Sequence, residues 1–175
     1  MGKLILILGG ARSGKSSFAV AQAKKLSSGH SSVVYVATAF ALDEEMKRRI
    51  KMHRKRRPTS WKTIEERVDI SKILAKLEKA SIVIIDCLTL LISNLLLSGE
   101  REVVTLKKMK EFFTTIKKRN LTTLIVSNEV GMGIVPENRL ARSFRDIAGQ
   151  INQTLAELSD EVYLLEAGIP IKIKG

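Results

Sequence analysis

The sequence predicts a single-domain α/β fold, with a mostly parallel central sheet, helices on both faces and an antiparallel pair of strands at the carboxyl-terminal edge. Short apolar runs, typical of strands buried on both faces, alternate with segments of helical spacing along the 175 residues. Such alternation indicates parallel strands joined by crossover helices. No internal repeat or linker interrupts the series. The length matches the roughly 100–200 residues of one domain, expected here over residues 1–175.

The amino-terminal third contains two expected strands and two expected helices. Lys3–Leu8 contains a continuous apolar run closed by two glycines, which indicates a buried strand, and Ser16–Leu26 has the pattern of a helix. Val33–Ala37 is the second expected strand. From Leu42 onward the apolar residues recur at helical spacing as far as Pro58, which stops the helix.

The rest of the chain continues the alternation. Thr59–Val68 is expected to be a polar connection, and Asp69–Ala80 a short amphipathic helix. The remaining elements are a strand over Ile82–Asp86, an apolar helix over Leu88–Leu97, a lysine-rich amphipathic helix around residues 106–119, a strand over Leu121–Ser127, a glycine-rich loop over Asn128–Asn138, a helix over Arg139–Leu158, and two strands over Glu161–Leu165 and Ile169–Ile173. The last two strands form the antiparallel edge.

The composition excludes a membrane-spanning chain and indicates an anionic partner. The longest apolar run after the amino terminus, Leu88–Leu97, is half of the roughly 20 residues that span a bilayer. The lone Cys87 cannot form an internal disulfide, so a reducing, cytoplasmic location is expected. The net charge of +12 makes nucleic acid the first partner to consider. Eight of these charges lie within Met46–Pro58, whereas the lysines of residues 107–119 are expected to form a solvated helix face.

The strongest local signal is a phosphate-binding loop. Residues 9–16 read GGARSGKS and match G-x-x-x-x-G-K-[ST] after a buried strand and at the start of a helix. In such a loop backbone N–H groups surround phosphate oxygens, Lys15 reaches the β- and γ-phosphates, and Ser16 can hold Mg²⁺. The alternative is a glycine-rich turn that binds nothing. The candidate nucleotide-binding residues are Gly9, Gly10, Ala11, Arg12, Ser13, Gly14, Lys15 and Ser16.

An acid at the end of a neighbouring parallel strand is the expected partner of this loop. Asp86 ends the apolar run Ile82–Ile85 and is predicted to hold Mg²⁺ directly or through water, with a helix cap as the alternative. Cys87 is expected to be a small core residue. The loop Ser127–Asn138 follows another strand end, where ligand crevices form, although a tight connection is equally compatible with its glycines.

His53 is one of two histidines and lies near the apolar stripe of its expected helix, directly before four cations. Spacing alone favours a structural helix histidine. The functional alternative is a neutral imidazole that attacks a phosphorus centre, with phosphoryl charge stabilised by Arg54, Lys55, Arg56 and Arg57.

Taken together, these segments resemble the bifunctional adenosylcobinamide kinase/adenosylcobinamide-phosphate guanylyltransferase family. The resemblance runs from end to end and rests on GGARSGKS at 9–16, YVATA at 35–39, DEEMKRRIKMHRKRRP at 43–58, IDCLTLLISNLL at 85–96 and VSNEVGMGIVPENRLARSFRDIAGQINQ at 126–153. It implies a RecA-like P-loop NTPase fold and two reactions of cobalamin (vitamin B12) biosynthesis. These are phosphorylation of adenosylcobinamide, and transfer of GMP from GTP to the resulting phosphate with release of pyrophosphate.

The resemblance also implies roles for individual residues. His53 would carry GMP, because Met52 replaces the first of two adjacent histidines found in some relatives. Mg²⁺ is the one cofactor implied, GTP, ATP and adenosylcobinamide are the small-molecule partners, and a homotrimer is implied, with Leu88–Leu97 as a candidate contact. Further nucleotide contacts would come from Ala37, Thr38, Ala39, Arg54, Lys55, Arg56, Arg57, Glu65 and Asp86, and the metal contacts from Ser16 and Asp86.

Two other functions remain open at this point. A small-molecule kinase could use the same loop without a covalent histidine step. A nucleic-acid-binding ATPase could use the basic run, although an aromatic content of 5% offers few stacking platforms for single strands. The family resemblance favours neither, and predicts no nucleic-acid partner.

Overall fold

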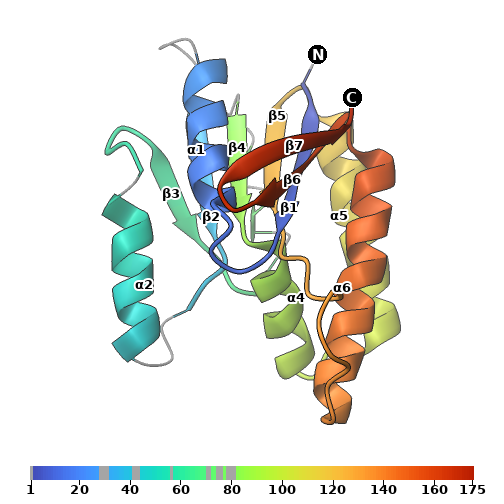
Figure 1. The fold of residues 1–175 in the computed structure, drawn as a ribbon. Helices are drawn as coiled ribbons and strands as arrows, with labels where there is room; N and C mark the ends of the chain where they lie inside the picture. The colour runs from blue at the N-terminus through green and yellow to red at the C-terminus, as the bar shows by residue number, and fades with distance from the viewer. Residues whose placement is uncertain are drawn as a thin grey trace.

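A computed structural model describes residues 2–27, 32–40, 44–55, 57–69, 72–73, 77 and 82–175, and this part of the chain forms a seven-stranded sheet with helices on both faces (Figure 1). The strand order is β3-β2-β4-β5-β1-β6-β7. The strands are β1 (Leu4–Gly9), β2 (Val33–Ala37), β3 (Lys62–Glu65), β4 (Ile82–Asp86), β5 (Thr122–Val126), β6 (Glu161–Glu166) and β7 (Ile169–Lys174). The helices are α1 (Lys15–Leu26), α2 (Glu44–Lys55), α4 (Leu88–Leu97), α5 (Glu102–Lys118) and α6 (Arg139–Leu158).

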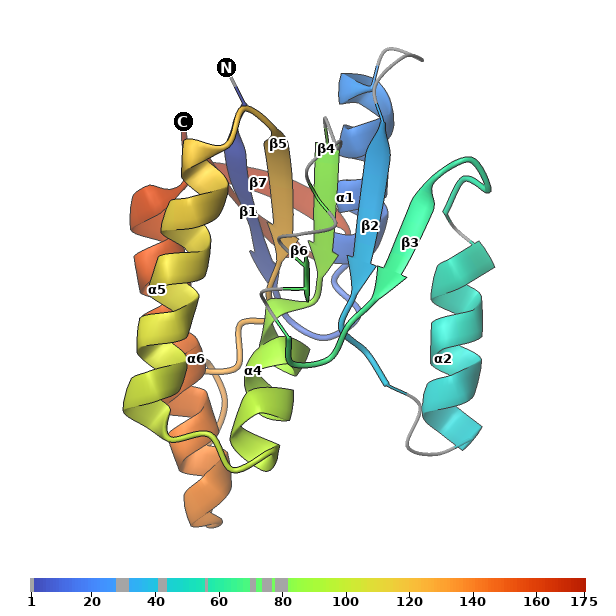
Figure 2. The same ribbon diagram turned by 180° about the vertical axis from the view of Figure 1, so that it is seen from behind.

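The central strands are buried on both faces, as the apolar runs predict. Alternate residues of β1 enter two separate cores: Leu4 and Leu6 pack with α4, α5 and α6, whereas Ile5 and Ile7 pack with α1. Figure 2 shows α5 and α6 on the face of the sheet opposite α1. The layered α/β architecture inferred from the alternation is therefore confirmed.

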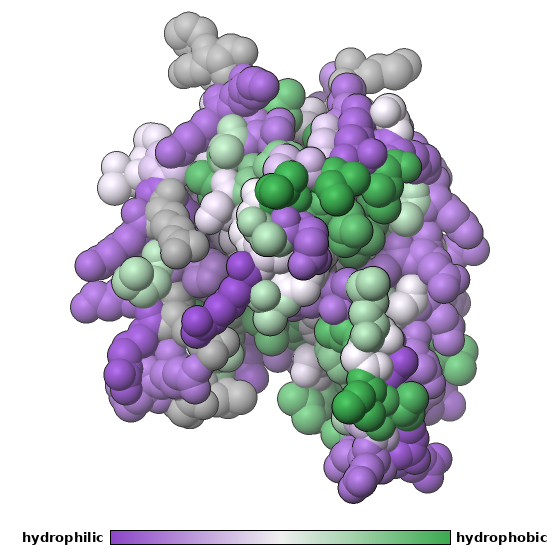
Figure 3. All heavy atoms as spheres, viewed as in Figure 1, coloured by the Kyte–Doolittle hydropathy of each residue, from purple (hydrophilic) through white to green (hydrophobic). Residues whose placement is uncertain are grey.

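The carboxyl-terminal edge has the predicted mixed geometry. Strand β6 is parallel to β1 and antiparallel to β7, and the turn between β6 and β7 places Ala167 and Gly168 at positive φ values of 49° and 85°. The side chains of Ile169, Ile171 and Ile173 on β7 are exposed and contribute to the apolar surface near that strand in Figure 3. The antiparallel edge is thus the least covered part of the sheet.

One predicted element is wrong. The segment Thr59–Val68, expected to be a polar connection, contains β3, which pairs in parallel with β2 at the opposite edge of the sheet. Of the four β3 residues only Ile64 is buried, because an edge strand has one neighbour and little cover. A strand with a single buried residue has no periodic apolar signal. Most of the helix expected over Asp69–Ala80 lies outside the described residues, although Ile73 and Leu77 are buried.

The two lysine- or leucine-rich helices pack largely within the chain. The lysines of α5 are exposed, as predicted, and its buried residues are Thr105, Met109, Phe112, Phe113 and Ile116. On α4 most leucines and isoleucines are buried, but Leu97 is 67% exposed. Leu97 is thus an exposed apolar side chain at the end of α4, and the homotrimer contact expected on this helix stays a prediction. No helix in the described ranges is both long and apolar enough to cross a membrane.

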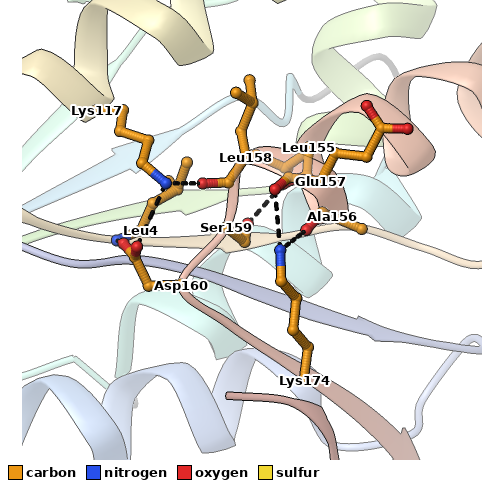
Figure 4. Close-up of polar contacts among 9 residues, drawn as sticks. All are labelled: Leu4, Lys117, Leu155, Ala156, Glu157, Leu158, Ser159, Asp160 and Lys174. Carbon is orange, nitrogen blue, oxygen red and sulfur yellow. Dashed lines mark hydrogen bonds and ion pairs between the residues drawn. The ribbon is translucent and has the colours of Figure 1, made fainter.

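Lysines from two elements close the carboxyl-terminal end of α6 (Figure 4). Lys174 of β7 donates to the carbonyl oxygens of Ala156 and Glu157, at 2.8 and 2.9 Å, and Lys117 of α5 donates to that of Leu158. These carbonyls have no partner within the helix, and a cation there opposes the negative end of the helix dipole. This lysine clamp, defined as Lys117, Lys174 and the carbonyls they bind, gives the lysine-rich helix a specific structural contact.

Asp160 extends the clamp to β1. Its Oδ2 accepts a hydrogen bond from the Leu4 backbone N–H at 2.8 Å, and its Oδ1 lies 3.3 Å from Lys117 Nζ. The Leu4 hydrogen bond, followed by Lys117, lowers the pKa of Asp160 despite partial burial. The ionised carboxylate therefore stabilises the fold at pH values above 3.8, the ordinary pKa of an aspartate. That stabilisation is lost as the pH falls from 3.8 through the lowered pKa of Asp160.

We expect Asp160→Asn to reduce the free energy of unfolding at pH 7 by on the order of 1 kcal/mol, a modest loss because the side chain is partly solvated. Urea titrations at several pH values should show the difference from the parent shrinking below pH 3.8. Glu157→Gln is the matched control, since this exposed carboxylate points away from the clamp (Figure 4). A difference that persists unchanged at pH 2 would contradict the assignment.

Candidate active site

The phosphate-loop motif forms a turn between β1 and α1, at the edge of the sheet where the carboxyl ends of the parallel strands lie. Lys15 is buried, and its Nζ lies 2.5 Å from the Gly10 carbonyl oxygen and 3.4 Å from Ser13 Oγ. Burial lowers the pKa of this ammonium, with Cys87 and Asp86 acting in the opposite direction. Two backbone hydrogen bonds hold the loop to its surroundings. The Gly168 N–H donates to the Ser13 carbonyl at 3.1 Å, and the Glu129 backbone N–H donates to the Gly9 carbonyl at 3.0 Å.

Two loop glycines occupy conformations that other residues rarely adopt. Gly9 has a φ of 150°, and a Cβ there would lie 2.4 Å from the Leu165 carbonyl oxygen and 2.6 Å from Ser13 Oγ. Gly14, at the start of α1, has a φ of 95°. Glycine is thus required at Gly9 because a side chain would clash with Leu165, and it is favoured at Gly14 because the backbone has a positive φ.

Gly9→Ala should destabilise the fold by on the order of 3 kcal/mol, because overpacking against a backbone carbonyl adds to the strain at positive φ. Gly10→Ala is the matched control, since a Cβ at Gly10 would meet nothing within 4 Å. We expect the control to change stability by less than about 0.5 kcal/mol in the same denaturant titration. Equal losses in both variants would show that general loop flexibility, and not the contact with Leu165, decides the effect.

Asp86 lies at the same edge, but its strand is not the direct neighbour of β1 that the motif reasoning assumes. Strand β5 pairs with both β1 and β4 and separates them. The carboxylate is 11% exposed, and its charge still acts on Lys15. Its Oδ2 accepts a hydrogen bond from the Tyr35 hydroxyl. Sequence order does not reveal an intervening strand, which explains the error.

The segment Ala37–Ala39, expected to line the nucleotide site, begins at the last residue of β2 and is hydrogen-bonded to the end of β4. The Thr38 backbone N–H donates to the Asp86 carbonyl at 3.2 Å, and the Thr38 hydroxyl donates to the Cys87 carbonyl at 2.7 Å and accepts from its N–H at 2.9 Å. Asn94 of α4 donates to the Thr38 carbonyl at 3.0 Å. The Thr38 side chain therefore holds β2 and β4 together at the site, and Cys87 is buried as predicted.

The structure brings His53 to the same place. This residue lies near the end of α2 with its side chain 43% exposed, and its Nδ1 is 4.0 Å from Asp86 Oδ2. The cation Arg57 stacks over the Tyr35 ring, with its Cζ 3.6 Å from the ring centroid. A histidine that serves only its own helix would not face an acid on a distant strand. The phosphate loop, Asp86 and His53 thus meet at one edge of the sheet.

A pocket of about 500 Å³ lies between the end of α2 and β3, and Arg54, which follows His53 in the chain, borders it. Arg54 and Glu65 form an ion pair across it. In the described part of the chain, Arg57 Nε and Nη1 are buried without a hydrogen-bond partner, an arrangement that a phosphate oxygen would satisfy. Lys55 is exposed, and Arg56 lies outside the described residues. The pocket is lined by Arg54, Arg57, Pro58, Thr59, Trp61, Thr63 and Glu65.

The loop after β5 is anchored by a chain of buried polar side chains. Ser127 Oγ donates to Asn152 Oδ1 at 2.7 Å, Asn152 Nδ2 donates to the Asn128 carbonyl at 3.2 Å, and Asn128 Nδ2 donates to Thr89 Oγ1 at 2.8 Å. This chain links α6, the end of β5 and the start of α4. Farther along the loop, Met132 and Ile134 are almost fully exposed. Neither Asn152 nor Tyr35 stands out in the sequence, because a polar residue within a helix and an aromatic residue within a strand are ordinary.

Comparison with known proteins decides the family. A family model described as "Cobinamide kinase / cobinamide phosphate guanyltransferase" matches residues 5–173. The chain belongs to this family. It is therefore an enzyme of the kinase and guanylyltransferase type, and the resemblance inferred from the sequence motifs is confirmed.

Similar proteins agree with membership of the cobinamide kinase/guanyltransferase family. The "Bifunctional adenosylcobalamin biosynthesis protein CobU" of Escherichia coli is 40% identical over 98% of this chain and 99% of its own length, and that of Salmonella typhimurium is 42% identical over the same shares. The corresponding CobP of Pseudomonas aeruginosa is 43% identical over 97% and 96%. The flagellar accessory protein FlaH of Methanocaldococcus jannaschii has a TM-score of 0.62 at 16% identity, covering 99% of this chain and 78% of that one, which shows a shared fold alone.

Proposed function

We propose that this family member acts in adenosylcobalamin biosynthesis, phosphorylating adenosylcobinamide and then transferring GMP from GTP to the product through a guanylylated His53. The observation that carries the proposal is the meeting of the phosphate loop, Asp86 and His53 at one edge of the sheet, with His53 Nδ1 4.0 Å from Asp86 Oδ2. The near full-length relatives are named for adenosylcobalamin biosynthesis, which supports the pathway.

In the kinase reaction, the backbone N–H groups of residues 9–16 would surround the nucleotide phosphates, and Lys15 would contact the β- and γ-phosphates. Lys15 Nζ now lies against the Gly10 carbonyl and Ser13 Oγ, so this cation is already held inside the loop. Phosphoryl transfer requires mainly in-line positioning and neutralisation of charge, which the loop and this ammonium supply.

Magnesium fits the donor set at this edge. Among the described residues no three His, Cys, Asp or Glu side chains lie together as a metal centre, so the ion would rely on phosphate oxygens and water as well as on protein. Ser16 and Asp86 offer a hydroxyl and a carboxylate, which are the oxygen ligands that Mg²⁺ prefers. When bound, the ion would neutralise charge on the transferring phosphate.

In the guanylyltransferase reaction, His53 would attack the α-phosphorus of GTP and release pyrophosphate, and the phosphate of the substrate would then take the GMP. The two steps replace one difficult displacement by two easier ones. Arg54 and Arg57 border the adjoining pocket, where the two unpartnered nitrogens of Arg57 would bind phosphate oxygens. The anionic substrates then account for the basic run at Met46–Pro58 without any nucleic acid. A homotrimer stays a prediction from the family.

Incubation of the purified protein with adenosylcobinamide, ATP or GTP, and Mg²⁺ tests the proposal. We expect a phosphorylated and then a GDP-linked corrinoid, and α-labelled GTP should leave an acid-labile, alkali-stable label on the protein. A phosphorylated corrinoid without labelled protein would favour a kinase that lacks the covalent step. ATP hydrolysis stimulated by nucleic acid, with binding steeply weakened by salt, would favour the ATPase alternative.

A further inference from the structure

Two side chains from two elements converge on a single oxygen atom of β4, Asp86 Oδ2. The Tyr35 hydroxyl of β2 donates a hydrogen bond to it, and His53 Nδ1 of α2 lies 4.0 Å away. This separation exceeds a normal N–H···O distance by about 1 Å. Catalytic hydrogen bonds are often long before the substrate binds and tighten in the complex. The ring nitrogen that faces the acid is therefore Nδ1, and Nε2 is the nitrogen left for chemistry.

Tyr35 is well placed to hold the carboxylate in this orientation. Its side chain is 1% exposed, so the surrounding core fixes the position of the ring. The hydroxyl at the end of this fixed ring donates to Asp86 Oδ2. On its ring lies Arg57, whose guanidinium carbon is 3.6 Å from the centroid. One buried tyrosine therefore contacts both the acid that faces His53 and a cation of the adjoining pocket.

We infer that GMP is carried on Nε2 of His53, with Asp86 accepting a hydrogen bond from Nδ1–H and Tyr35 acting as the positioning residue that orients Asp86. This inference rests on the proposed guanylyltransferase function and adds to it the reacting atom and two supporting residues. Carboxylates that bind one ring nitrogen commonly select the histidine tautomer that reacts at the other.

The atoms and charges balance in this scheme. The Nε2 lone pair forms the P–N bond to the α-phosphorus of GTP, the bond from that phosphorus to the β-phosphate oxygen breaks, and pyrophosphate leaves with the bond electrons. The Nδ1 proton stays in place, so the ring becomes cationic, and the Asp86 carboxylate stabilises that charge. In the second step a phosphate oxygen of the corrinoid attacks the same phosphorus, and the P–N electron pair returns to Nε2. The magnesium role proposed for Asp86 belongs to the separate kinase reaction.

The first test locates the bond. The wild-type protein is labelled with α-³²P GTP and Mg²⁺, digested in alkali, and the labelled histidine is compared with standards substituted at Nε2 and at Nδ1. Label at Nε2 is the expected result. Label at Nδ1 would overturn this inference while leaving a guanylylated His53 intact, whereas absence of label on His53 would overturn the proposed function itself.

The second test addresses Tyr35. Tyr35→Phe removes the hydroxyl and keeps the ring beneath Arg57, so single-turnover guanylylation should slow by roughly tenfold, as expected for the loss of one orienting hydrogen bond, while the Kd for GTP stays within about twofold. Tyr163→Phe is the matched control, because it removes a phenol that donates to Glu161 at 2.8 Å on β6, away from the site. A rate unchanged in Tyr35→Phe, or lowered equally in the control, would overturn the positioning role.

A spectroscopic measurement separates positioning from a general structural effect. In ¹⁵N-histidine NMR the neutral His53 ring should show the tautomer protonated at Nδ1, and Tyr35→Phe should shift it towards a mixture of tautomers. The protein has two histidines, so His53→Ala identifies the signal. An Nε2-protonated ring in the wild type, or a tautomer insensitive to Tyr35→Phe, would contradict the inference.

Discussion

Lys15→Ala should lower both the kinase and the GMP-transfer rates by roughly 10²–10³-fold, the range seen when one preorganised charge-stabilising group is removed. In the proposed mechanism both reactions use a nucleoside triphosphate bound by the same loop, in which the Lys15 ammonium is buried and lies 2.5 Å from the Gly10 carbonyl oxygen. The other cation of this loop, Arg12, is exposed, so it does not occupy the buried position of the Lys15 ammonium. The decisive measurement is the rate of each product formed from adenosylcobinamide.

Lys24→Ala provides the control for this experiment. Lys24 is exposed in the last turn of α1, the helix that Lys15 begins, and its substitution should leave both rates unchanged. Thermal melts of the two variants check that the fold is retained. Loss of only one activity in Lys15→Ala would show that the two reactions do not share one phosphate site.

His53→Ala should abolish GMP transfer and leave corrinoid phosphorylation measurable, because the imidazole is required only as the acceptor of GMP. Removal of a covalent nucleophile commonly lowers a rate by several orders of magnitude, on the order of 10⁴-fold or more. The kinase parts, namely the loop and Asp86, lie on β1, α1 and β4 and remain in place. Product analysis with labelled GTP and ATP therefore separates the two reactions within one protein.

The adjacent Met52→Ala is the matched control for His53→Ala. Met52 is 55% exposed on the same turn of α2, so its truncation tests whether any change near the end of this helix is harmful. We expect full GMP transfer in Met52→Ala. GMP transfer by His53→Ala at the wild-type rate would refute the assigned nucleophile.

Local sequence patterns predicted the parts of the site that depend on local geometry. The GGARSGKS loop lies between a strand and a helix as expected, because glycine conformation and strand-to-helix context are encoded within about ten residues. Asp86 likewise ends a strand whose apolar run is visible in the sequence. Helix α6 begins at Arg139 and ends at Leu158, the bounds expected from the sequence.

The features that depend on long-range packing could not be predicted in this way. The position of β5 between β1 and β4 is a property of strand order in the sheet, and the hydrophobic period of a strand does not indicate strand order. Strand β3 buries one residue, and its identity as a strand comes from pairing with β2. Tyr35 resembles any other aromatic strand residue until β4 and α2 bring Asp86 and Arg57 to it. The charge pattern of α2, by contrast, indicated a candidate functional segment without showing what His53 faces.

The lysine clamp lies at the end of the sheet opposite the phosphate loop, because the loop follows the carboxyl end of β1 whereas Asp160 binds the backbone at its start, Leu4. This separation matters for protein engineering. Substitutions that strengthen the contacts around Lys117 and Lys174 should raise heat tolerance and leave the candidate nucleotide-binding residues unchanged. Stabilising substitutions at the lysine clamp should therefore cost little activity, because the clamp and the candidate active site lie at opposite ends of the same sheet.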